Sequence, residues 1–97
     1  MSDPRDVSVC NLLFKIVGVL VDRPEVVVIQ TQGTEDGATF TVHAHPDDIG
    51  KLIGNQGRNA QSLRIITSGA GKKLRRRYVI AIHGNRLTVS IDVTYIR

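Results

Sequence analysis

Residues 49–63 read IGKLIGNQGRNAQSL, and at their centre lies the motif Gly-Asn-Gln-Gly of residues 54–57. The apolar residues on either side of the motif have helical spacing, and two glycines three positions apart let the backbone turn sharply between two helices. The glycines also carry no side chain, so that a ligand can approach the backbone closely. We therefore predict a short helix that stops at Gly54 and a longer one that begins near Arg58.

The pattern outside this stretch predicts an α+β fold. Asp3-Pro4 favours the start of a helix, which Pro24 ends after an apolar run. Strands are predicted over residues 26–31 and 39–44, as a hairpin with its turn over 32–37, and over residues 78–82. Residues 83–85 are predicted as a turn and residues 86–96 as an additional C-terminal strand. The element order is α-β-β-α-α-β plus this strand, and we expect a single domain over residues 1–97 with a core over about 6–83.

The first predicted helix is apolar nearly all round. One stripe contains Val9, Leu13, Ile16, Val17 and Leu20, and a second set contains Val7, Leu12, Phe14, Val19 and Val21. This pattern indicates burial on two sides, or a surface for a partner.

Charge is distributed unevenly along the chain. The net charge is +4, but residues 1–48 hold three bases and eight acids, a net of −5, whereas residues 49–97 hold ten bases and one acid, a net of +9. An electropositive side of this kind attracts polyanions such as nucleic acids. Charge alone fits equally well with a basic surface that only keeps the protein in solution.

The glycine motif has a chemical use in the predicted fold. The N–H groups in the first turn of the following helix point toward the motif, which makes it a suitable seat for phosphate. Lys51 and Arg58 flank the motif and add cationic donors. A Gly-x-x-Gly pair on its own is also consistent with a simple turn between helices.

Three segments, LVDRPE at 20–25, PDDIGK at 46–51 and IGNQGR at 53–58, resemble the K homology (KH) domain of type II topology. The similarity is closer to the small single-domain bacterial KH proteins of the KhpA type, and it runs from about Leu12 to about Ile82. It implies a mixed three-stranded sheet backed by three helices. It also implies non-catalytic binding of single-stranded RNA, in which the glycine loop clamps about four nucleotides.

The resemblance and the charge pattern together give the candidate RNA contacts. Around the loop they are Lys51, Ile53, Gly54, Asn55, Gln56, Gly57, Arg58, Ala60, Gln61 and Arg64. A secondary basic patch contains Lys72, Lys73, Arg75, Arg76 and Arg77, a run that also resembles a nuclear localisation signal. Ile49 and Leu63 are candidates for the groove or the core. The sequence departs from the family at Asn55 and Gln56, where KH loops often carry a basic residue, and in its additional C-terminal strand.

The resemblance further implies a role as an RNA chaperone or post-transcriptional regulator, with a second KH protein or a second copy of the chain as partner. We expect no enzymatic activity and no cofactor, because the sequence contains no catalytic motif. We expect no metal site either, because His43 and His45 lack a third ligand. One cysteine, no leader-like N-terminus and no membrane-spanning run lead us to expect a cytoplasmic location.

Two alternatives remain open from the sequence. One is a protein-interaction or scaffold module that assembles through the first helix and the C-terminal strand, whose free edge invites pairing. The other is binding of single-stranded DNA, because KH grooves accept either nucleic acid.

Overall fold

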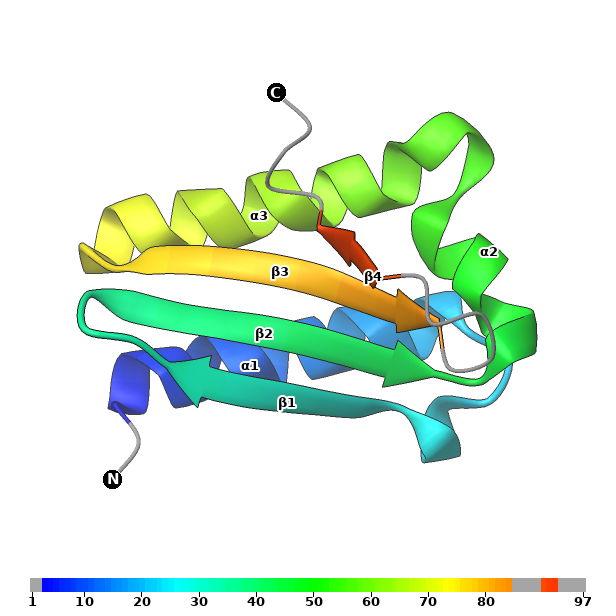
Figure 1. Ribbon diagram of the computed structural model, residues 1–97, viewed down its shortest axis with the longest axis horizontal. Coiled ribbons are helices and arrows are strands. Elements are labelled where there is room, and N and C mark those ends of the chain that lie inside the picture. Colours follow the sequence, from blue (N-terminus) through cyan, green and yellow to red (C-terminus); the bar gives the residue numbers. More distant parts are fainter. Residues whose placement is uncertain (1–2, 85–89, 93–97) are drawn as a thin grey trace.

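The computed structural model describes residues 3–84 and 90–92. The elements follow the predicted order (Figure 1). They are α1 (Pro4–Leu20), β1 (Val28–Gly33), β2 (Gly37–Ala44), α2 (Ile49–Ile53), α3 (Arg58–Leu74), β3 (Arg77–Gly84) and β4 (Ser90–Asp92). Three short 3-10 turns, Pro24–Val26, Pro46–Asp48 and Asn55–Gly57, connect them.

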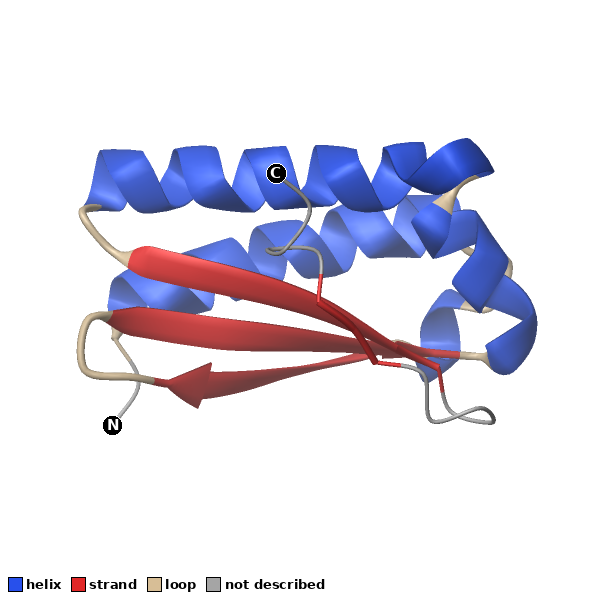
Figure 2. Ribbon diagram, turned by 45° about the horizontal axis from the view of Figure 1, so that its top comes forward, coloured by secondary structure: helices blue, strands red, loops and turns tan. Residues whose placement is uncertain are grey.

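The strands form one mixed sheet in the order β1-β2-β3-β4. β1 pairs with β2 antiparallel, β2 with β3 parallel, and β3 with β4 antiparallel. The helices lie together on one face of the sheet (Figure 2). Because parallel neighbours need a crossover connection, α2, the glycine loop and α3 carry the chain back between β2 and β3. The predicted α+β fold with three helices and a mixed sheet is confirmed.

The core lies between the helices and the covered face of the sheet. Its fully buried side chains include Leu13 of α1, Phe40 of β2, Leu52 of α2, Leu63 of α3 and Ile80 of β3. Each helix therefore contributes to one shared apolar cluster. The alternation predicted for the second strand is also confirmed, because Phe40, Val42 and Ala44 are buried and the residues between them are half-buried.

α1 begins and ends where the sequence predicts. The Asp3 carboxylate accepts a hydrogen bond of 2.8 Å from the Arg5 N–H and caps the helix. Val9, Leu13 and Val17 are buried. Of the second apolar set, Val21 is buried, but the side chains Val7, Leu12, Phe14 and Val19 are exposed. Within the described residues, burial on two sides, the first of the two interpretations of this pattern, is therefore wrong, and the surface for a partner stays a prediction.

The hairpin boundaries differ from the prediction. β1 starts at Val28 and not at Val26, because residues 24–26 form a 3-10 turn after Pro24. It also continues to Gly33, which pairs with Ala38. The turn is accordingly tighter than predicted, and the Thr34 N–H donates a 2.9 Å hydrogen bond to the carbonyl of Gly37.

β3 is longer than predicted at both ends. His83 and Gly84, which the sequence suggests as a turn, continue the strand and pair with His43 and Ala44 of β2. Of the C-terminal strand predicted over 86–96, residues 90–92 form β4 and pair with residues 81–83 of β3. Residues 85–89 and 93–97 lie outside the described part of the chain.

Candidate nucleic-acid interface

The glycine loop depends on backbone conformations that favour glycine. Gly54 and Gly57 have φ angles of 78° and 75°. A Cβ atom at Gly54 would also lie 2.8 Å from the backbone nitrogen of Asn59, so this position has no room for a side chain. Gln56 adopts a left-handed conformation as well, with φ 57°, at a cost of about 1 kcal/mol for a non-glycine residue. Neighbouring hydrogen bonds must therefore hold the loop in shape.

Three hydrogen bonds fix the loop between α2 and α3. The Gly54 N–H donates to the Gly50 carbonyl over 2.8 Å, and the Gly57 N–H donates to the Gly54 carbonyl over 3.1 Å. The Asn59 side-chain amide donates to the Lys51 carbonyl over 2.7 Å and so joins the first turn of α3 to the last turn of α2. Asn59 was not predicted from the sequence as part of the site. It could have been recognised as an amide donor close to the end of the preceding helix, where the last carbonyl groups lack partners within the helix.

The exposed side of this loop can accept an anion. Asn55, Gln56 and Arg58 are exposed, and among the described residues no side chain caps the start of α3. The Arg58 N–H donates to the Asn55 carbonyl, and the N–H groups that follow it in the first turn are left without a side-chain cap at the positive end of the helix dipole. Beside them lies an open hollow of about 490 Å³. Its lining residues are Gln56, Gly57, Arg58, Gln61 and Ser62.

The two cations predicted at the loop have different surroundings. The Lys51 ammonium lies 3.2 Å from the Asp22 carboxylate and 3.6 Å from that of Asp48. The hydrogen bond to Asp22, helped by the charges of both acids, raises the pKa of Lys51 above its usual value. Arg58 makes no ion pair with any described residue. Arg58 is therefore the cation with more charge available to a ligand.

The apolar candidates divide between surface and core. Ile53 is half-buried beside the loop and lies outside the core cluster, whereas Ile49 packs against that cluster. Ala60 and Leu63 are 1% and 2% exposed and belong to the core. Ala60 therefore supports α3 from beneath and offers no contact surface, so we leave it out of the proposed contacts. Gln61 and Arg64 are half-buried on α3.

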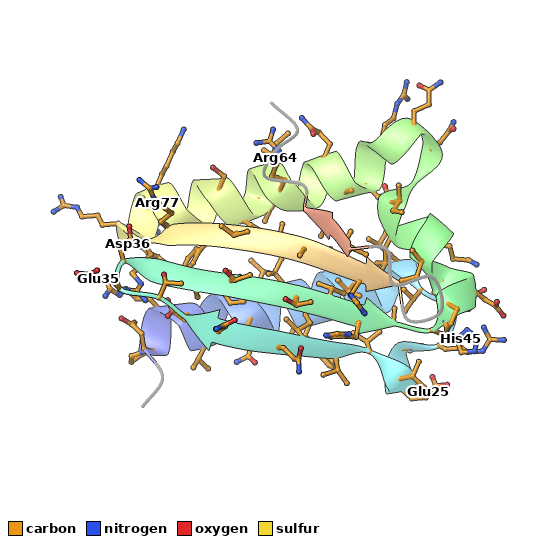
Figure 3. The ribbon with its side chains drawn as sticks, in the orientation of Figure 1. Glu25, Glu35, Asp36, His45, Arg64 and Arg77 are labelled. Carbon is orange, nitrogen blue, oxygen red and sulfur yellow. The ribbon has the colours of Figure 1, made fainter. Side chains whose placement is uncertain are left out.

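The basic run of residues 72–77 extends from the last turn of α3 to the start of β3 and lies at the end of the molecule opposite the glycine loop (Figure 1). Residue 61 and the end of α3 at Leu74 are separated by 13 positions of helix, or about 20 Å. The run is also divided in its interactions. The Arg76 guanidinium donates to Asp6 over 2.7 and 3.1 Å and to the Gly37 carbonyl over 3.0 Å, and Arg77 lies 3.6 Å from Asp36 (Figure 3).

The remaining cations of the run, Lys72, Lys73 and Arg75, are exposed and form no ion pair with the described residues. Arg76 is largely buried, with 12% of its side chain exposed, and its hydrogen bonds lower the pKa of the Asp6 carboxyl. Arg76 thus has a structural role. The basic patch that is free to bind a ligand is therefore smaller than the one proposed from the sequence.

The model of the KhpA/KhpB KH-domain family matches residues 11–82 of the 97-residue chain. The chain belongs to this family. The matched part extends from α1 to β3 and contains the whole glycine loop, and the mixed sheet backed by helices agrees with a KH-type fold.

Curated relatives of this KH-domain chain are proteins of bacteria. RNA-binding protein KhpA of Mycobacterium tuberculosis is 43% identical over 56 residues, which cover 58% of this chain and 70% of the relative. RNA-binding protein KhpA of Listeria monocytogenes is 39% identical over 63 residues, which cover 65% of this chain and 83% of the relative. RNA-binding protein KhpA of Oceanobacillus iheyensis is 42% identical over 55 residues, which cover 57% and 73%. No solved structure matches the chain.

The described part of the chain contains neither a metal-binding cluster nor a helix that could cross a membrane. Within residues 3–84 and 90–92, no three side chains of the metal-binding kinds lie close enough together to hold an ion. None of the helices described there has the length and apolar character that crossing a membrane requires.

Proposed function

We propose that this KH-domain chain binds single-stranded RNA at the glycine loop and catalyses no reaction. The observation that carries the proposal is the uncapped start of α3 beside a loop whose exposed tip is Asn55-Gln56. The curated relatives, which are named RNA-binding proteins, support the same function. About four nucleotides is the length that a loop of this kind clamps.

Each contact has a distinct role in this proposal. The N–H groups that follow Arg58 in the first turn of α3 bind phosphate oxygens, and the Asn55 and Gln56 amides hydrogen-bond to phosphate or sugar. Arg58 supplies the free charge. Ile53 offers an apolar surface to a base, and Gln61 and Arg64 lie further along α3. A single domain with few charged contacts gives modest affinity that falls as salt rises.

The test is the double substitution Asn55→Asp and Gln56→Asp, which places two negative charges where phosphate should lie. We expect this variant to lose binding to a short single-stranded RNA at low salt, measured by fluorescence anisotropy. The loop side chains are exposed, so the fold should remain intact. Undiminished RNA binding by the double variant would refute the proposed site.

A matched control separates local from long-range charge effects. Asn11→Asp with Gln32→Glu changes the net charge equally, at exposed positions on α1 and β1 away from the loop. This control should keep most of the affinity, because screening weakens charge effects over more than about 10 Å.

Competition between RNA and DNA oligomers of one sequence then tests whether the site distinguishes the 2′-hydroxyl.

In the cell, such binding would serve an RNA chaperone or post-transcriptional regulator. Its partners would be a second KH protein or a second copy of the chain. The exposed apolar side chains of α1 favour a second candidate function, a protein-interaction module. Val19 is 85% exposed and Phe14 is 48% exposed.

Helical geometry weakens this second candidate. Val7 and Phe14 lie on one line along α1 and Leu12 and Val19 on another, about 140° apart around the helix. Between the two lines lie exposed polar residues, among them Ser8, Asn11 and Lys15. Light scattering with and without RNA distinguishes the candidates. A scaffold assembles without RNA and is insensitive to the loop double variant.

A further inference from the structure

We propose that a second phosphate-binding site lies at the C-terminal end of α3, and that one RNA strand reaches it from the glycine loop along a single flank of that helix. This inference rests on the proposed function, because the loop provides the anchor for the strand. Beyond the proposed function, it names the group that is bound at the second site, a backbone phosphate of a longer RNA, and the residues that bind it there.

The flank is marked by the spacing of its polar residues. Gln61, Arg64, Ser68, Lys72 and Arg75 follow one another at intervals of three, four, four and three positions. This spacing places the first four on one side of α3, and Arg75 follows directly after the end of the helix. The line begins at the hollow beside the loop, which Gln61 helps to form, and it ends at the basic run. Arg64 lies midway along α3 (Figure 3).

The far end of this line opens into a second hollow, of about 530 Å³. Ser68 and Lys72 of α3 line it, together with Arg75 just after the helix and Arg77 and Tyr78 at the start of β3. The flank therefore faces β3. Within the described residues, β4 pairs with β3 only at residues 81–83, so the edge beside this hollow has no neighbouring strand.

Charge in the second hollow comes chiefly from two residues. Lys72 and Arg75 are exposed and make no ion pair with the described residues. Arg77 is partly neutralised by Asp36, which lies 3.6 Å away and also lines the hollow. Arg76 directs its guanidinium to Asp6. Lys72 and Arg75, with the Ser68 hydroxyl as a hydrogen-bond donor, are thus the groups that can bind phosphate.

The distance between the two hollows sets the length of RNA required. About 20 Å of helix separates residue 61 from the end of α3 at Leu74, which Arg75 follows. At the 3.4 Å spacing of stacked nucleotides in one strand, this distance corresponds to about six nucleotides. Together with about four nucleotides at the loop, the bound length is about ten. An oligomer of about four nucleotides would engage the loop alone.

The test variant combines Lys72→Ala with Arg75→Gly. Glycine is chosen at residue 75 because Arg75 has a φ of 59° at the end of α3, a conformation in which glycine is favoured. Lys73→Ala is the matched control. Lys73 is adjacent, exposed and equally charged, but helical geometry places it about 100° around α3, and it does not line the second hollow.

Affinities are measured for random-sequence RNA of about twelve nucleotides, with wild type and variants compared at one length. A longer RNA offers more positions at which a protein can bind, and this effect cancels when both proteins are measured with RNA of the same length. Loss of two phosphate contacts lowers the salt slope of binding by about 1.4, so the affinity ratio of wild type to variant should differ by about sevenfold between 50 and 200 mM salt. Lys73→Ala should leave the slope nearly unchanged. Equal effects of the test variant and the control would overturn the proposal.

Amide NMR shifts separate failure of this inference from failure of the proposed function. The Gly54 and Gly57 signals should shift with RNA of either length, whereas those of Ser68 and Lys72 should shift only with the longer one. If the loop signals do not move with either length, the proposed function fails. If the loop signals move but the Ser68 and Lys72 signals stay unchanged with the longer RNA, only the second site is refuted.

A gain of affinity offers a test that misfolding cannot imitate. Asp36→Asn frees Arg77 and removes the one acid among the described residues that line the second hollow. We expect severalfold tighter binding of the twelve-nucleotide RNA and unchanged binding of the four-nucleotide RNA. Unchanged affinity for the longer RNA would contradict the second site.

Discussion

Asp6 is a buried carboxylate that joins three parts of the chain. It is 4% exposed in α1 and accepts hydrogen bonds from Arg76 and from the Tyr78 hydroxyl, which lies 2.7 Å away. Arg76 also donates to the Gly37 carbonyl at the start of β2. A buried charge is tolerated when its partners are complete, and removal of one partner is costly. This cluster therefore fixes the end of the molecule that carries the basic run.

Tyr78→Phe should destabilise the protein by about 1–3 kcal/mol at neutral pH, because it removes a hydrogen bond to a buried carboxylate. Burial, followed by the hydrogen bond to Asp6, raises the pKa of Tyr78 from 10.0 to about 12. A raised pKa contributes stability that is full below about pH 10 and is lost as the pH rises through about 12. Urea unfolding of both proteins across this range measures the difference.

The outcome that would contradict this account is an equal alkaline loss of stability in wild type and Tyr78→Phe. The phenylalanine ring keeps the edge-on packing against Phe40, whose ring centre lies 5.2 Å from that of Tyr78. Comparison of the two proteins therefore isolates the hydroxyl group.

Individual side chains were predicted least completely from the sequence. The run of residues 72–77 is basic apart from Leu74, but Arg76 is largely buried because Asp6, 70 positions earlier, folds against it. Local spacing contains no information on such a distant pair. The sequence likewise predicted the turn at the glycine loop from Gly54 and Gly57, but not the left-handed conformation of Gln56 or the bond from Asn59.

The short helix α2 is held by a second buried carboxylate. Asp48 is 0% exposed and accepts a 3.1 Å hydrogen bond from the Arg23 N–H, which ties the start of α2 to the connection after α1. Lys51, one turn further along, lies 3.6 Å from the same carboxylate. Because α2 has only five residues, its position, and with it that of the glycine loop, depends on such contacts.

Asp48→Asn should lower the free energy of unfolding, and the adjacent exposed Asp47→Asn serves as the matched control. Burial raises the pKa of Asp48, but hydrogen bonds from the Arg23 and Asp22 backbone and the charge of Lys51 outweigh it, so the net pKa is lowered. The corresponding stability is present above about pH 4 and is lost as the pH falls through the folded-state value.

Denaturant unfolding between about pH 2 and 7 measures this effect. The acid-dependent loss should be smaller in Asp48→Asn than in wild type and in Asp47→Asn. If both asparagine variants behave alike, Asp48 does not hold α2 in place.

Whole helices and strands were predicted well, since periodicity reports which face of an element is buried. Their ends were predicted less well, because pairing with a neighbour decides where a strand stops. Gln32 and Gly33 remain in β1 because they face Thr39 and Ala38, and His83 remains in β3 because it faces His43. No signal within those residues distinguishes them from a turn.

For the molecule as a whole, the sequence predicted the charge asymmetry but not its arrangement in space. Within the described residues, the basic residues of the second half lie near the glycine loop and at the opposite end of α3, with Arg64 between them (Figure 3). Several acids lie beside them, including Asp22 at Lys51 and Asp36 at Arg77. The net charge of a chain segment therefore overstates the charge that its surface presents to a ligand.

The parallel pairing of β2 with β3 also has a consequence for folding kinetics. Gly37 pairs with Arg77 and Ala44 with Gly84, so partners along this ladder are 40 positions apart. Contacts of such long range slow folding, because the chain must lose loop entropy before they form. The glycine loop is the sharp bend inside that crossover. The two glycines that leave room for a ligand thus also allow the chain to return to its own sheet.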